Sequence, residues 1–108
     1  MVLRPRMVRH GDDVTDLMWA VLLLDRAQTH ALAERVVAEP RLARAHGLHE
    51  LDTVNAALPP GFFVLQDELV TRAKAVAAAS RQADDRVLSK AFGQLMETCV
   101  ACHAAYLR

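Results

Sequence analysis

The chain has 108 residues, of which 53% are hydrophobic, so it is long enough for one domain with a buried core. Its formal net charge is zero, which gives no electrostatic reason to expect nucleic acid as a partner. The longest apolar run, Leu17 to Leu24, is far shorter than the ~20 residues of a membrane span, so no membrane-spanning segment is expected. Its pattern is that of a buried helix face.

The chain is predicted to consist of an arm and one helical domain. Residues 1–12 are interpreted as a flexible N-terminal arm, because they are rich in charge and precede the first regular apolar pattern. Residues 13–108 are expected to form a single four-helix domain. Asp13 as N-cap, followed by apolar residues at three/four spacing, predicts a first helix from about residue 13 to 38, ending before Pro40.

Three further helices are predicted. Apolar residues at helical spacing over 48–58 indicate a short second helix before Pro59-Pro60-Gly61. The third covers about residues 62–80. The fourth begins at Asp84 or Asp85 and continues toward the C-terminus. No alternating strand pattern is present, so the expected fold is an all-α, up-down-up-down four-helix bundle with a short second helix.

The last predicted helix carries the sequence Cys99-Val100-Ala101-Cys102-His103. C-x-x-C-H is the attachment signature of a c-type haem. At about 100° per residue, the two cysteines and the histidine fall within one arc of about 100° on a helix. Cys99 and Cys102 are therefore predicted to bind one covalent haem c through thioether bonds, and His103 to bind its iron.

Other interpretations of the motif stay open. A redox disulfide usually lies at a helix N-terminus, where the dipole lowers the thiol pKa, whereas this pair is near a C-terminus. A structural zinc site usually needs four Cys or His ligands, and the chain has two cysteines. Two inert cysteines beside a surface histidine are the third possibility. The alternative function is thus that of a haem-free helical module with a disulfide or metal clip. No Ser/His/Asp set or phosphate-binding loop is found, and an enzyme is not expected.

With its C-terminal motif, its four predicted helices and Tyr106 three residues after His103, the chain resembles the class II cytochromes c, the cytochrome c prime family. The resemblance implies haem attachment at Cys99 and Cys102 and a proximal His103. It also implies a periplasmic protein whose leader peptide lies outside this sequence, often a homodimer that pairs through its first two helices. The family's basic residue directly after the tyrosine is replaced here by Leu107.

The sixth iron ligand separates two predicted functions. If the first helix extends to residue 38, counting down the antiparallel first and last helices places Met18 level with His103. A Met18 ligand predicts an electron carrier that serves a redox partner protein. An apolar residue there, such as Leu22, predicts an open iron that binds NO or CO. Trp19, Leu22 and Tyr106 are expected to line the haem pocket.

Overall fold

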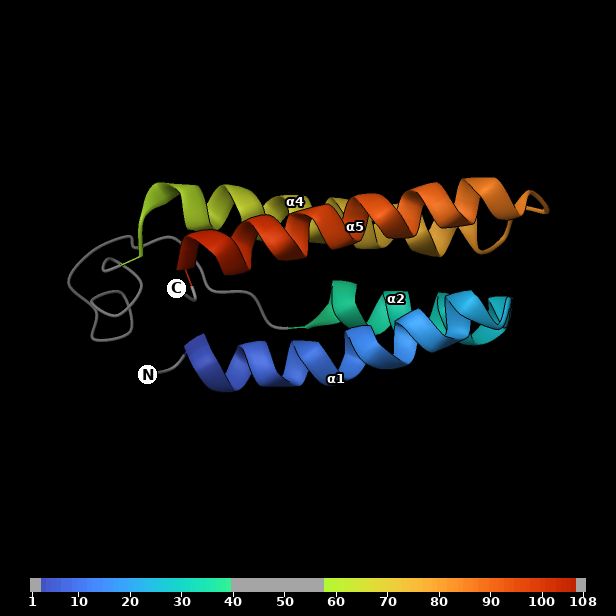
Figure 1. Cartoon of the computed structure of the whole chain (residues 1–108), viewed down its shortest axis with the longest axis horizontal. Coiled ribbons are helices and arrows are strands. Elements are labelled where there is room, and N and C mark those ends of the chain that lie inside the picture. Colours follow the sequence, from blue (N-terminus) through green and yellow to red (C-terminus); the bar gives the residue numbers. More distant parts are fainter. Residues whose placement is uncertain (1–2, 40–57, 107–108) are drawn as a thin grey trace.

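The computed structural model describes residues 3–39 and 58–106, which form four α-helices and no strand. The helices are α1 (Leu3–Leu22), α2 (Arg26–Ala38), α4 (Pro60–Ala79) and α5 (Asp85–Tyr106). Each helix runs antiparallel to the next, so two helical hairpins, α1–α2 and α4–α5, lie side by side (Figure 1). The predicted all-α, up-down-up-down bundle with a short second helix is confirmed, although a different segment forms that helix.

The predicted first helix over 13–38 is wrong, because the chain reverses direction in its middle. Leu24 has a φ of 56°, and its amide donates to the carbonyl of Val21 over 3.0 Å. The amide of Asp25 donates to the carbonyl of Ala20 over 2.9 Å. These two bonds are those of a Schellman motif, which ends α1. The Asp25 carboxylate then caps α2 by accepting from the amide of Gln28 over 3.1 Å.

The start of the first helix also differs from the prediction. α1 begins at Leu3, so the segment interpreted as an arm is helical from that residue. Polar side chains of α1 contact α2 and its C-cap: His10 Nδ1 lies 2.6 Å from Oε2 of Glu39, the C-cap residue, and Asp13 pairs with Arg35 over 3.0 Å. These contacts exist because α2 folds back along α1, which a short sequence window does not reveal.

The predicted third and fourth helices are confirmed as α4 and α5. Pro59 and Pro60 occupy the N-cap and first position of α4, where the missing amide hydrogen has no cost. Asp84 caps α5 by accepting from the amide of Arg86 over 2.9 Å, and its hydrogen bonds with Arg86 lower the pKa of its carboxyl. The helix predicted over 48–58 lies almost entirely outside the described residues.

All four helices contribute to one hydrophobic core. Leu17, Val76, Leu88 and Leu95 have no more than 1% of their surface exposed. Thr29 is also buried, and its hydroxyl donates to the carbonyl of Asp25, the N-cap residue of α2, over 2.7 Å. The other buried apolar residues in this cluster are Ala20, Val21, Leu32, Ala33, Val36, Ala73, Ala77, Ala79 and Ala91.

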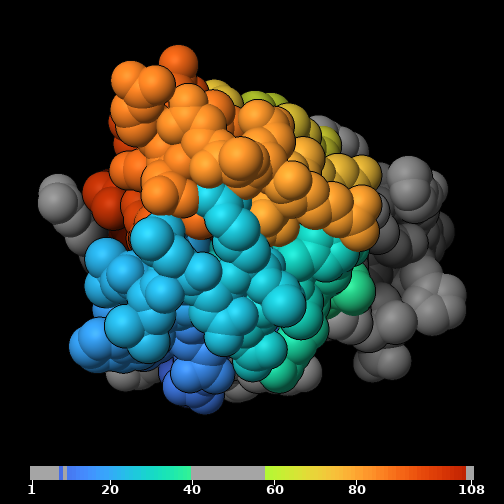
Figure 2. Space-filling model, turned by 90° about the vertical axis from the view of Figure 1, so that its right-hand side faces the viewer, coloured from blue at the N-terminus to red at the C-terminus, as the bar shows by residue number. Residues whose placement is uncertain are grey.

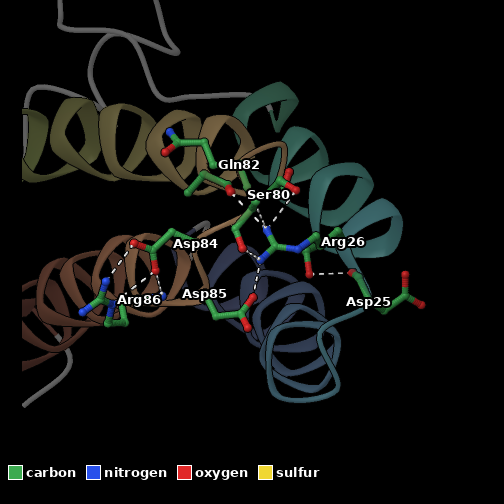
Figure 3. A network of polar contacts seen from close by, with 10 residues as sticks. Asp25, Arg26, Ser80, Gln82, Asp84, Asp85 and Arg86 are labelled. Atoms are coloured by element: carbon green, nitrogen blue, oxygen red, sulfur yellow. Dashed lines mark hydrogen bonds and ion pairs between the residues drawn. The ribbon is translucent and has the colours of Figure 1, made fainter.

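Arg26, the first residue of α2, joins the two hairpins at one end of the bundle (Figure 3). Its guanidinium pairs with the carboxylate of Asp85, the first residue of α5. It also donates to carbonyl oxygens at the end of α4 and in the α4–α5 turn, where helix carbonyls lack intrahelical partners. These carbonyls belong to Ala79, Ser80, Gln82 and Ala83.

The same end of the bundle exposes apolar side chains. Figure 2 views this end, where the α1–α2 turn lies beside the α4–α5 turn. The predicted buried face is confirmed for Leu17 and Val21, but Leu22 and Leu23 are 64% and 72% exposed. They are exposed because α1 ends at Leu22 and the chain turns away from the core. In the described part of the chain, no helix combines the length and the hydropathy needed to span a bilayer.

A candidate haem attachment site at the end of α5

The three residues of the motif lie on one unbroken helix. α5 continues through Cys99, Cys102 and His103 to Tyr106, which confirms the predicted helical arrangement. Cys99 packs against the edge of the hydrophobic core, and both cysteines are half-buried. His103 is exposed. The two sulfurs and the imidazole thus lie within one arc of the helix, between the core and solvent.

The two thiols are free, and their surroundings favour the neutral S–H form. Burial raises the pKa of both Cys99 and Cys102, and the charge of a Cys102 thiolate would raise that of Cys99 further. A reactive redox cysteine shows the opposite shift, because the thiolate is the nucleophile. The position near the C-terminus of α5 adds to the effect, since the negative end of the helix dipole disfavours a thiolate.

Two contacts with α4 flank the turn that carries the motif. Before it, the buried hydroxyl of Thr98 lies 3.4 Å from Glu68 Oε1 on α4. After it, the ring of Tyr106 packs edge-on against Phe62, with ring centroids 5.5 Å apart. The motif is therefore held against α4 on both sides.

The neighbouring helix α2 ends before it reaches this turn. α2 and α5 begin at the same end of the bundle, where Arg26 meets Asp85, and they run in the same direction (Figure 1). At 1.5 Å per residue α2 is about 20 Å long, whereas α5 is about 33 Å long. Among the described residues, the last turns of α5 therefore extend past the end of α2. Cys102 and His103 lie in this extension.

The structure does not bring Met18 to His103. α1 ends at Leu22, at the end of the bundle where α5 begins (Figure 1). Met18 is one turn from that end, whereas His103 is about 27 Å along α5 from Asp85, so the two are about 20 Å apart along the bundle. Met18 was predicted to lie level with His103 on the assumption that the first helix extends to residue 38, but that helix is broken at Leu24.

The three residues predicted to line the haem pocket lie at opposite ends of the bundle. Trp19, 56% exposed, and Leu22 lie near the α1–α2 turn, far from the motif. Tyr106 lies beside His103 on α5, and its ring contacts Phe62 of α4. Of these three residues, Tyr106 alone is beside the motif.

Sequence reasoning missed the aromatic pair at the start of α4, of which Phe62 contacts Tyr106 beside the motif. Phe62 and Phe63 are 4% and 5% exposed, and their rings meet edge-to-face at 5.5 Å. Their signal was an aromatic pair directly after Pro59-Pro60-Gly61, but the partner ring, Tyr106, comes from the end of α5, far along the sequence. The part of α1 level with His103, roughly residues 3–8, was also missed, because its position depends on the break at Leu24.

Comparison with protein-family models, curated proteins and solved structures finds no match to this chain. Within residues 3–39 and 58–106, no three His, Cys, Asp or Glu side chains come together as a metal ion would require. A zinc site at Cys99 and Cys102 would need ligands from outside those residues.

Proposed function

We propose that this chain is a c-type cytochrome of the class II, four-helix type. In this proposal Cys99 and Cys102 hold one haem c covalently, and His103 is the axial ligand of its iron. One observation carries the proposal: two free, half-buried thiols and an exposed imidazole share one arc of a continuous helix. The expected periplasmic location belongs to the same proposal.

The state of the thiols suits covalent attachment. In the proposed attachment, each cysteine would add its S–H across one vinyl group, with the sulfur bonding one vinyl carbon and the hydrogen passing to the other. The addition consumes no oxidant or reductant, but it requires reduced, unpaired sulfurs. Cys99 and Cys102 are unpaired, and burial raises the pKa of each, which keeps them as thiols.

The protein's own contribution is to bind and orient. His103 offers an imidazole from the helix that bears both sulfurs, and the core edge beside Cys99 provides an apolar surface. The bound haem supplies one-electron redox chemistry or gas binding at the iron. We propose electron transfer between redox partners as the function. NO or CO binding at an open sixth position is the second candidate, because Met18, the predicted sulfur ligand, lies at the opposite end of the bundle.

Attachment is tested by producing the protein, with an added leader, in a host that has c-type maturation. The purified protein should gain the mass of one haem and retain it through acid-acetone extraction. Cys99→Ala with Cys102→Ala should abolish attachment. Val100→Ala is the matched control, because Val100 lies between the cysteines and is 67% exposed. Haem that extracts freely from the wild-type protein contradicts the proposal.

The homodimer implied by the resemblance also stays a prediction. The exposed apolar side chains of the α1–α2 turn are a surface that a second copy would cover, since contiguous apolar patches commonly mark interfaces. Light scattering should give a dimer mass, and Leu23→Ser should shift the mass toward the monomer. A wild-type monomer mass at every concentration contradicts this expectation.

A further inference from the structure

The last turn of α5 rests on the first turn of α4 through aromatic rings. The Tyr106 and Phe62 centroids are 5.5 Å apart with an interplanar angle of 75°. Phe62 in turn meets Phe63 at 5.5 Å and 89°. Edge-to-face pairs of this kind are attractive beyond the area that they bury, and Phe62 and Phe63 are themselves buried. The Tyr106 ring therefore packs against a fixed surface.

Gly61 completes this surface. A Cβ atom added at Gly61 would lie 2.9 Å from the Tyr106 hydroxyl oxygen, closer than such atoms approach. The glycine is thus needed for the tyrosine to lie where it does. Pro59 and Pro60 precede it, and the amide of Phe62 donates to the carbonyl of Pro59 over 3.0 Å. Because proline fixes its backbone φ, the start of α4 is a stiff support for the ring.

Tyr106 is connected to His103 through less than one turn of helix. Three residues correspond to about 4.5 Å of rise and about 60° of rotation, so the two side chains leave the same side of α5. The last carbonyls of a helix have no intrahelical partners, and helix ends fray unless other contacts hold them. His103 itself is exposed. The contact of Tyr106 with α4 is what holds this turn.

We propose that Tyr106, packed against Phe62 and over Gly61, is a positioning residue for His103. It acts through the backbone of the last turn of α5 and fixes where the imidazole stands relative to the rest of the bundle. This inference rests on the proposed function, because the consequence of positioning is a stable bond between His103 and iron.

The test uses the haem-containing protein and follows the loss of the histidine ligand on acidification by the Soret band. Gly61→Ala and Tyr106→Leu should each raise the midpoint pH of this loss by about half a unit. Such a shift means that the bond between His103 and iron has weakened about threefold relative to protonation of the imidazole. Gly93→Ala is the matched control, because a Cβ at this helical glycine would meet nothing within 4 Å. Its midpoint should stay at the wild-type value.

A second variant separates positioning from general destabilisation. Tyr106→Phe added to Gly61→Ala removes the hydroxyl that the new Cβ would meet, so the midpoint should return toward the wild-type value. Urea unfolding of each variant is measured in parallel. Lower stability with an unshifted midpoint in both Gly61→Ala and Tyr106→Leu overturns the role of Tyr106 and leaves haem attachment intact. A wild-type protein without covalent haem overturns the proposed function and this inference together.

Discussion

Leu24 adopts a φ of 56°, in the left-handed region that costs an ordinary L-residue about 1–2 kcal/mol. Its side chain is 52% exposed, so packing returns little of this cost. The strain is offset by the two Schellman hydrogen bonds and by the Asp25 cap that starts α2.

Replacing Leu24 by glycine should therefore stabilise the protein. Glycine relieves the left-handed strain but gives the unfolded chain more freedom, so Leu24→Gly should raise the free energy of unfolding by up to about 1 kcal/mol. Arg81→Gly is the control, because Arg81 is an exposed turn residue outside the α1–α2 turn and does not have a positive φ. It should lower stability slightly. Urea denaturation measures both, and equal effects would mean that the chain does not turn at Leu24.

At the scale of helices, the sequence predicts α4 and α5 well, because their ends carry explicit signals. Pro59-Pro60-Gly61 marks the start of α4, and Asp84 caps α5. At the break between α1 and α2, Asp25 caps the start of α2, but the end of α1 carries no glycine or proline. Leu24 occupies the left-handed position that glycine usually takes, and it is itself part of the predicted apolar pattern.

The same contrast explains what could be predicted of the site. Cys99, Cys102 and His103 are neighbours in sequence on one helix, so their geometry follows from helical spacing alone. Residues that face them from other helices depend on where each hairpin turns. Met18 was therefore misplaced along the bundle, and Phe62 was missed.

Arg26 makes the contacts between the hairpins that are easiest to test. Arg26→Ala should lower the free energy of unfolding by about 1–2 kcal/mol, because carbonyls of the α4–α5 turn and the Asp85 carboxylate lose a charged donor. Arg26→Lys should recover only part of the loss, since an ammonium cannot match the planar guanidinium. Thermal unfolding gives the comparison.

Arg86→Ala is the matched control for Arg26. Arg86 is 92% exposed and pairs with Asp84, two residues away, so its removal should change stability by less than about 0.5 kcal/mol. If both alanine variants lose equal stability, Arg26 does not join the hairpins.

At the scale of the whole molecule, the reversal at Leu24 changes which part of α1 lies level with His103. The last turn of α5 and the first turns of α1 lie at the same end of the bundle, while Met18 lies near the other end (Figure 1). A protein ligand to iron must reach within bonding distance, which a separation of about 20 Å along the bundle forbids for Met18.

This arrangement predicts the outcome of one methionine variant of the haem-containing protein. Met18→Ala should leave the optical spectrum and the rate of CO binding unchanged. If the ferric protein shows the weak far-red band of a sulfur ligand, Met18→Ala should keep that band. A high-spin wild-type spectrum with rapid CO binding after reduction would instead favour the gas-binding function. Loss of the band in Met18→Ala would contradict the break at Leu24, because only a continuous helix over 13–38 places that sulfur level with His103.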